Sequence, residues 1–290
     1  MFYSVIPIYN PDFSHVKTMV EEIEKAGIVP ILFDNTPGGF SFPEGKNKVQ
    51  CKVLGDNSNQ GLSVAFNLTL EYVREIDKEF EGIIFFDQDS SVVAESLTRL
   101  VQDYKLLSDS GYKVGVLGAQ ATDGSGTEYQ THPAESITPL PENFYSTWFV
   151  ISSFSLVPKT TFDLIGDFDG RLFIDLVDSE FSFRCSKFGL DNIITRNVKF
   201  PHVIGESRHK FLGRPYAVSS PIRNYYQFRN IILVGRKYGW YLYMLKLLAR
   251  RVLQFTLSGL HEKNLLLRYK YMIFGFIDGI KGKGGIYPRG

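Results

Sequence analysis

The chain has 290 residues, 44% of them hydrophobic and 22% charged, which is the composition of an ordinary globular protein and excludes a largely disordered one. Its two cysteines, Cys51 and Cys185, are too few for a disulfide framework and lack the paired spacing of a zinc site, so the sequence favours a reducing compartment. The segment MFYSVIPIYN has neither a basic region nor a long apolar stretch. We therefore expect no signal peptide and a cytoplasmic protein.

A net charge of +1 conceals a strong asymmetry along the chain. Residues 1–204 contain 16 Lys and Arg against 28 Asp and Glu, a net charge of −12. Residues 205–290 contain 16 Lys and Arg against three acidic residues, a net charge of +13. This split predicts two regions with different partners, a first domain over 1–205 and a basic region over 206–290.

In chain order, the acidic part alternates short apolar runs with amphipathic ones. Ser14 could cap the first of the amphipathic runs and Gly27 could end it. The alternation predicts a mostly parallel sheet covered by helices, and ligands of such sheets bind beyond the carboxyl ends of the strands. Tyr9, Asp34 and Asp87 stand at such ends. The expected strands are 3–8, 28–35, 48–56 and 82–89, and the expected helices are 14–27 and 61–76.

The remainder of the acidic part is less regular. Residues 122–146 are rich in Gly, Thr, Ser, Pro and Glu without a clear period, which indicates a long loop or an irregular hairpin. A serine-rich strand is expected over 146–157 and a helix over 178–189.

The basic region reads as three helices, over 221–239, 240–260 and 264–280. None contains an uninterrupted apolar run of roughly 18 residues, so no membrane-spanning helix is expected. The middle helix has a basic side and an apolar side, the pattern of an interfacial helix. Packing on the first domain and an oligomer interface are the alternatives. The two sides are Lys246, Arg250 and Arg251, and Leu245, Leu248, Val252 and Phe255.

The segment FFDQDS ends an apolar strand in two carboxylates, Asp87 and Asp89. Two such groups suit a hard divalent cation, Mg²⁺ or Mn²⁺, which bridges to substrate phosphates and needs only one or two protein carboxylates. The alternative is that Asp89 caps the next helix and Asp87 begins a turn.

Other strand ends and turns carry polar groups with two interpretations each. Asp34 could accept hydrogen bonds from a pyrimidine or a ribose, or it could form an Asp-Asn turn. Gly61 offers a glycine turn into a helix near a nucleotide, or simply a helix boundary. His202 could contact a metal or a phosphate, although a single histidine can equally be structural.

Three carboxylates, Asp175, Asp178 and Glu180, lie close together in the segment LFIDLVDSEFSFR. One of them could act as a general base, a role that contributes roughly 10² to 10⁴ in rate. The alternative is that Asp178 and Glu180 only favour the positive N-terminal end of a helix.

Taken together and in order, seven short segments resemble the family 2 glycosyltransferases, and in particular the bacterial rhamnosyltransferases among them. The resemblance extends over residues 3–238. It implies a GT-A fold, a Rossmann-like, mostly parallel central sheet flanked by helices, here followed by a helical, basic, amphipathic extension. It also implies a nucleotide-sugar donor and inversion at the anomeric carbon. The segments are VIPIYN, FDN, NQGLSVAFN, FFDQDS, LFIDLVDSEFSFR, HVIGES and YYQFRN.

The resemblance also implies roles for individual residues. Family members commonly have a Glu-Asp pair six residues before the arginine that corresponds to Arg184, so Asp178 takes the place of the base, with Val177 where the pair has Glu. This departure weakens the generic match but fits the rhamnosyltransferase-like pattern DxVDxE. The implied donor-site residues are Pro7, Tyr9, Asp34 and Gly61 for the nucleotide, Asp87 for the ribose and diphosphate, and Asp89 with His202 for Mg²⁺ or Mn²⁺.

The implied partners are a nucleotide-diphosphate sugar, dTDP-rhamnose, and a saccharide or lipid-linked oligosaccharide acceptor in cell-surface polysaccharide synthesis. The basic helices suggest an anionic membrane surface as a third partner, which would place the protein peripherally on the inner face of the cell membrane. No nucleic acid is expected.

Two other functions remain open at the sequence level. FFDQDS also resembles the nucleophile motif of the haloacid-dehalogenase phosphatases, in which Asp87 would be the nucleophile, although at least three expected strands precede it here. A nucleotide-sugar fold retained as a non-catalytic, membrane-associated scaffold is the other.

Overall fold

The computed structural model describes residues 1–42, 51–123, 125–129, 133–136, 139–202, 207–211 and 214–288, with only the backbone described over 207–211 and 214–218. Parts of the expected strand 48–56 and of the expected loop 122–146 therefore lie outside the described residues, as does the boundary expected at 205. Contacts divide the chain into a sheet unit, residues 1–168 and 178–202, and a helical unit, residues 169–177 and 203–290.

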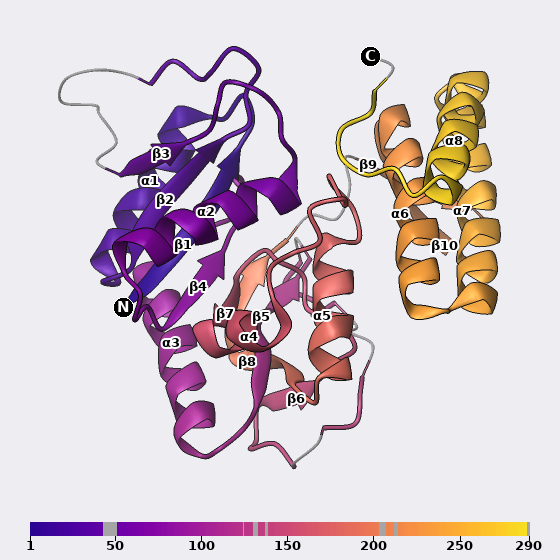
Figure 1. Cartoon of the computed structure of the whole chain (residues 1–290). Coiled ribbons are helices and arrows are strands. Elements are labelled where there is room, and N and C mark those ends of the chain that lie inside the picture. Colours follow the sequence, from indigo (N-terminus) through magenta and orange to yellow (C-terminus); the bar gives the residue numbers. More distant parts are fainter. Residues whose placement is uncertain are drawn as a thin grey trace. The chain divides into compact units, whose positions relative to one another are not determined.

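The sheet unit is built on one mixed sheet with the strand order β3-β2-β1-β4-β7-β5-β8-β6 (Figure 1). Strand β7 is antiparallel to both β4 and β5, so these two point the same way, and β1, β2, β3 and β8 share that direction. The expected mostly parallel sheet is confirmed. The strands are β1 Phe2–Ile8, β2 Val29–Asp34, β3 Lys52–Leu54, β4 Gly82–Phe85, β5 Val114–Thr122, β6 Phe144–Ser146, β7 Ser155–Pro158 and β8 Asp191–Pro201.

Helices cover both faces of this sheet (Figure 1). On one face α1 and α3 pack together, and the Glu22 carboxylate of α1 accepts the first backbone N–H of α3, from Ala94, at 3.0 Å. On the other face α2, α4 and α5 meet in a cluster of phenylalanines, Phe66, Phe162 and Phe181, around Phe168. The helices are α1 Phe13–Lys25, α2 Leu62–Ile76, α3 Ala94–Asp109, α4 Lys159–Ile165 and α5 Val177–Lys187.

Two local expectations need correction. Helix α1 begins one residue earlier than expected and is capped by Asp12, whose carboxylate accepts the Ser14 backbone N–H at 3.0 Å, whereas Gly27 (φ +74°) does follow its end. The strand expected over 146–157 is instead the end of β6, a connection without strand structure, and β7. Phe154 in that connection has φ +57°, which an extended strand cannot accommodate.

The three C-terminal helices are confirmed as α6 Pro221–Tyr238, α7 Tyr241–His261 and α8 Leu265–Ile280, preceded by a hairpin of β9 Ser207–Phe211 and β10 Arg214–Val218. Helices α6 and α8 pack closely because Gly275 has no side chain: a Cβ there would meet the Tyr225 carbonyl oxygen at 2.4 Å. None of the helices in the described part of the chain is both long and apolar enough to cross a membrane.

The segment 169–177 belongs to the helical unit because α6 binds its backbone. Arg229, fully buried, donates to the Arg171 carbonyl oxygen at 3.0 Å, and the Asn230 amide donates to two successive carbonyls of the segment at 2.8 Å each. Phe173 stacks on Tyr226 with ring centroids 4.8 Å apart. Asp175, one of the candidate bases, forms an ion pair with Arg223.

Candidate functional site

The candidate residues of the sheet unit lie along one edge of the sheet. Because β1, β2, β4 and β8 are parallel, their carboxyl ends meet at the same edge. Tyr9 follows β1, Asp34 ends β2, Asp87 follows β4, and His202 follows β8. Pro7, half-buried, lies within β1 near that end. The topology thus gathers residues that are almost two hundred positions apart in the sequence.

Asp34 organises the loop after β2. Its carboxylate, almost fully buried, accepts the backbone N–H of Thr36 at 2.8 Å and that of Phe40 at 2.6 Å. The turn considered for Asp34 is therefore present. A carboxylate oxygen can accept more than one hydrogen bond. The contact between Asp34 and a nucleotide therefore stays a prediction that this turn allows.

Gly61 is the N-cap of α2, with φ +81° and ψ 178°, a conformation that favours glycine. The helix-boundary interpretation thus describes its geometry. Asn35, which sequence analysis passed over, joins β2 to this turn: its side-chain oxygen accepts the Gln60 N–H at 3.0 Å and its amide donates to the Gly61 carbonyl at 3.4 Å. The strand end and the helix start are thereby held together.

The loop carrying Asp87 and Asp89 is a tight turn closed by Ser90. Ser90 donates its backbone N–H to the Asp87 carbonyl at 3.0 Å, and its hydroxyl accepts the Asp87 N–H at 3.1 Å. The expected turn at Asp87 is thus observed. Asp89, in contrast, does not cap α3, because the N-cap is Val93 and Glu22 binds the N–H of Ala94. Asp89 is an exposed carboxylate at the sheet edge, and its capping role is ruled out.

Gln88, between the two aspartates, is a residue that sequence analysis missed. Its side-chain oxygen accepts the Tyr9 backbone N–H at 2.6 Å, and its amide nitrogen donates to the Tyr9 carbonyl at 3.2 Å. These two hydrogen bonds join the turn after β4 to the end of β1. The only sequence signal was the residue type, since a primary amide both donates and accepts.

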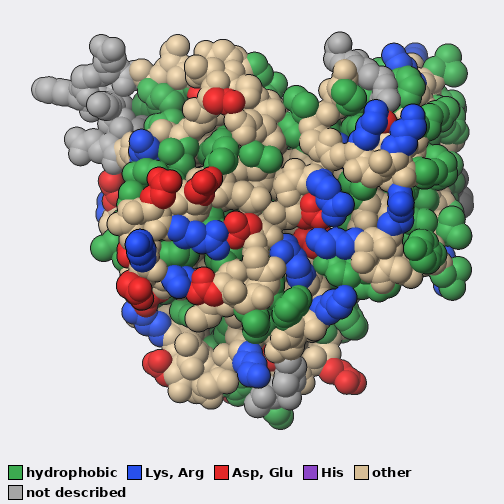
Figure 2. Space-filling view, viewed as in Figure 1, with side chains coloured by type: hydrophobic (Ala, Val, Ile, Leu, Met, Phe, Trp, Pro, Cys, Tyr) green, Lys and Arg blue, Asp and Glu red, His purple; other side chains and the backbone are tan. Residues whose placement is uncertain are grey.

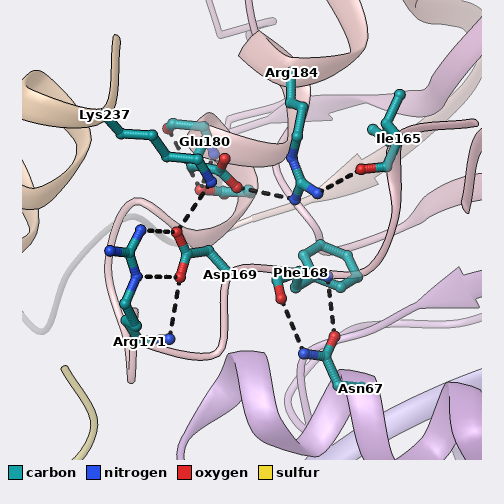
Figure 3. A network of polar contacts seen from close by, with 10 residues as sticks. Asn67, Ile165, Phe168, Asp169, Arg171, Glu180, Arg184 and Lys237 are labelled. Atoms are coloured by element: carbon teal, nitrogen blue, oxygen red, sulfur yellow. Dashed lines mark hydrogen bonds and ion pairs between the residues drawn. The ribbon is translucent and has the colours of Figure 1, made fainter. Parts of the chain in front are cut away.

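The two carboxylates in the first turn of α5, Asp178 and Glu180, have different surroundings. Glu180 is fully buried and paired with Arg184 at 3.1 Å, and Arg184 also donates to the Ile165 carbonyl at 2.8 Å (Figure 3). Asp178 is only half-buried, and its carboxylate accepts the Ser179 backbone N–H at 2.7 Å. Of the two, Asp178 is the more exposed residue.

Phe168, in the sheet unit, is fixed to α2 by the side-chain amide of Asn67. The Asn67 side chain accepts the Phe168 N–H at 3.0 Å and donates to the Phe168 carbonyl at 2.9 Å (Figure 3). The Phe168 ring in turn stacks on Phe181 of α5, with centroids 4.3 Å apart. These contacts give α5, and so Asp178, a rigid position on the sheet.

The pKa of His202 is affected by burial and by two of the candidate carboxylates, Asp89 and Asp178. Burial lowers the pKa of its imidazole, while the carboxylates of Asp89 and Asp178 act in the opposite direction. The His202 backbone is fixed by hydrogen bonds to Thr122 and from the Tyr129 hydroxyl, at 2.9 Å each.

The fold corresponds to that of known glycosyltransferases. GalNAc-T7, solved with UDP, GalNAc and Mn²⁺, superposes with a TM-score of 0.58 at 15% identity, over 97% of this chain and 56% of that one. Staphylococcus aureus TarS 1–349 superposes with a TM-score of 0.54 at 16% identity, over 96% of this chain and 80% of that one. The chain thus spans little more than half the length of the GalNAc-T7 chain. Both structures have the GT-A fold, and so does this chain.

Fold and full-length sequence similarity together relate this chain to the glycosyltransferases of the GT-A fold. The sequence is 28% identical over 298 residues to the dTDP-rhamnosyl transferase RfbF of Shigella flexneri, an alignment that covers 98% of this chain and 96% of that protein. No model of a known protein family matches the chain. The resemblance to bacterial rhamnosyltransferases is confirmed.

Proposed function

We propose that this protein transfers L-rhamnose from dTDP-rhamnose, with inversion, to a saccharide or lipid-linked saccharide in bacterial cell-surface polysaccharide synthesis. The observation that carries the proposal is the position of Tyr9, Asp34, Asp87 and His202 at the carboxyl ends of parallel strands, the edge of such a sheet at which ligands bind. The similarity to a dTDP-rhamnosyl transferase supports the nucleotide and the sugar.

Asp89 and His202 are proposed to hold Mg²⁺ or Mn²⁺. They fit such an ion, since Asp89 is an exposed carboxylate and burial favours the neutral, metal-binding form of the His202 imidazole. Among the residues that the structure describes, no three His, Cys, Asp or Glu side chains form a metal cluster. The protein would thus supply one or two ligands and the diphosphate others. A bound divalent ion would neutralise charge on the departing diphosphate.

The nucleotide is proposed to lie along the ends of β1 and β2 and the start of α2. The Tyr9 side chain, half-exposed beyond β1, is accessible to a base. Asp34 and Gly61 lie at the turn beside it, with Pro7 in the neighbouring strand, and Asp87 is proposed to face the ribose and diphosphate.

Asp178 is proposed as the general base. It would take the proton of an acceptor hydroxyl as that oxygen attacks the anomeric carbon, in a step with an oxocarbenium-like transition state. Asp178 lies in the first turn of α5, at the positive end of the helix dipole. A rigid α5 would keep this group in place for the attack.

A thermal-shift experiment on the full chain tests the donor. We expect dTDP and dTDP-rhamnose to raise the Tm in the presence of Mn²⁺ and to raise it much less in EDTA, because ligand at 100 times its Kd stabilises by about 2.7 kcal/mol. GDP and CMP serve as nucleotide controls. Equal shifts with and without metal would remove the metal from the proposal, and no shift with any nucleotide would remove the donor site.

The Gln88→Glu substitution tests the link between the two strand ends. The new carboxylate cannot donate to the Tyr9 carbonyl, so the turn after β4 loses one of its two hydrogen bonds to the end of β1. A carboxylate oxygen then faces the carbonyl oxygen, and the two repel each other. We expect KM for the donor to rise about tenfold, with Tm changed by only a few degrees, in steady-state transfer assays. Gln102→Glu, on the exposed surface of α3, is the matched control. An unchanged KM for Gln88→Glu contradicts the positioning role.

A further inference from the structure

The helical unit exposes an apolar stripe along α7 and α8. Its side chains recur at about seven-residue intervals on each helix, so they lie on one face of it. Thr256 and Tyr269, whose hydroxyl oxygens are 2.8 Å apart, connect the two helices beside the stripe. Figure 2 shows hydrophobic side chains gathered over these helices, at the right of the view. The apolar stripe is Leu245, Val252 and Leu260 of α7 and Leu266, Ile273 and Ile280 of α8, each 40% to 85% exposed.

The helix bundle does not need this stripe for its own packing. Leu248 and Phe255, on a different face of α7, are buried against Phe228 and Met272. The apolar side expected for the middle helix therefore divides into a buried face and an exposed one. Apolar surface of this extent on a soluble unit marks an interaction site.

Basic side chains accompany the stripe. Lys246 and Arg250 on α7 and Lys270 on α8 are exposed beside it. Arg251, expected on the same side, is instead half-buried, and this burial lowers its pKa while the charge of Asp175 acts in the opposite direction. Among the side chains described in the helical unit, Glu262 is the only exposed carboxylate.

An apolar stripe flanked by basic side chains favours one kind of partner for this surface. A second copy of this chain would bring the same cations together across a symmetric contact, which is unfavourable. An anionic lipid surface instead accepts apolar side chains and neutralises the cations around them. We propose that α7 and α8 lie on an anionic bilayer with the apolar stripe inserted, which places the transferase at the surface where a lipid-linked acceptor resides. The choice of that acceptor rests on the proposed function.

Vesicle flotation of the full chain tests this surface. We expect binding to vesicles of phosphatidylglycerol and phosphatidylcholine, weak binding to phosphatidylcholine alone, and weakening with salt. Replacing Lys246, Arg250 and Lys270 by Gln should lower the partition coefficient on anionic vesicles about fivefold per cation. No binding of the unaltered chain to anionic vesicles at low salt overturns the inference.

The apolar stripe is tested with the triple variant Leu245→Gln, Leu266→Gln and Ile273→Gln. These side chains are exposed, so the Tm should stay within a few degrees while vesicle binding falls more than about tenfold. Leu106→Gln with Leu164→Gln, at exposed leucines of the sheet unit, is the matched control and should bind vesicles normally. If the unaltered chain forms a dimer that the triple variant abolishes and neither binds vesicles, the stripe is a contact between copies and the inference is wrong.

Failure of this inference can be separated from failure of the proposed function. The metal-dependent Tm shift with dTDP needs only the sheet unit's donor residues, and the triple variant should retain it. Absence of vesicle binding by the unaltered chain, together with an intact dTDP shift, rejects the membrane surface alone. Vesicle binding without any nucleotide shift retains the membrane surface and rejects the donor.

Discussion

Replacing Asp178 by asparagine will lower kcat for sugar transfer by about 10² to 10⁴, because the amide cannot accept the proton of the acceptor hydroxyl. The substitution keeps the shape of the side chain and an oxygen that can accept the Ser179 N–H. We therefore expect the metal-dependent Tm shift with dTDP to be unchanged. Single-turnover transfer measured with saturating donor and acceptor checks the prediction.

Glu180→Gln provides the contrasting control two residues along the same helix. Glu180 is fully buried and paired with Arg184, so the loss of its charge leaves a largely buried guanidinium unpaired and costs about 3 kcal/mol of stability. This variant should lose Tm while its folded fraction keeps kcat. Turnover retained in Asp178→Asn would remove Asp178 from the role of base, and a loss of Tm like that of Glu180→Gln would make its effect structural.

The sheet and its functional edge were predictable because they depend on local patterns. Apolar runs such as Phe2–Ile8 and Val29–Asp34, separated by an amphipathic helix, favour a parallel arrangement with a crossover. Residues that follow such strands are then expected at one edge of the sheet, and this prediction needs no information on distant contacts. Tyr9, Asp34 and Asp87 were placed in this way.

Other features depend on partners far away in the sequence and could not be predicted. Gln88 acquires its role only once the end of β1 lies beside the turn after β4, 79 residues away. The segment 169–177 joins the helical unit through Arg229 and Asn230, whose buried polar side chains gave no sign of their partners. Helical periodicity also placed Leu245 with Leu248, although only Leu248 has a helix to pack against.

The two interpretations of Asp87 and Asp89 could be distinguished only once the fold was known. On sequence alone Asp89 was either a metal ligand or the cap of the next helix. Val93 occupies the N-cap and Glu22 supplies the acceptor for Ala94, so the exposed Asp89 carboxylate has no structural task in α3. Removal of the capping alternative strengthens the proposed metal role without testing it, and a direct test is the second large effect.

Replacing Asp89 by asparagine will weaken Mn²⁺-dependent donor binding by about 100-fold, because a neutral amide loses the charge attraction that a hard divalent cation requires. Donor affinity in EDTA should be unchanged, since it has no metal to lose. His202→Ala should weaken the metal-dependent part less, because the imidazole is the softer ligand of the two. Titration calorimetry with dTDP-rhamnose at several Mn²⁺ concentrations separates the metal-dependent part of the donor affinity from the metal-independent part.

The matched control is Asp163→Asn, an exposed carboxylate on α4 that pairs only with Lys159 in the described contacts. It removes the same charge from the same unit, so it measures any general electrostatic effect on the donor. If Asp163→Asn and Asp89→Asn weaken binding equally, the effect is long-range charge and Asp89 is not a ligand. If only Asp89→Asn abolishes the response to Mn²⁺, the turn after β4 holds the metal, and Gln88 and Ser90 are the residues that fix its position.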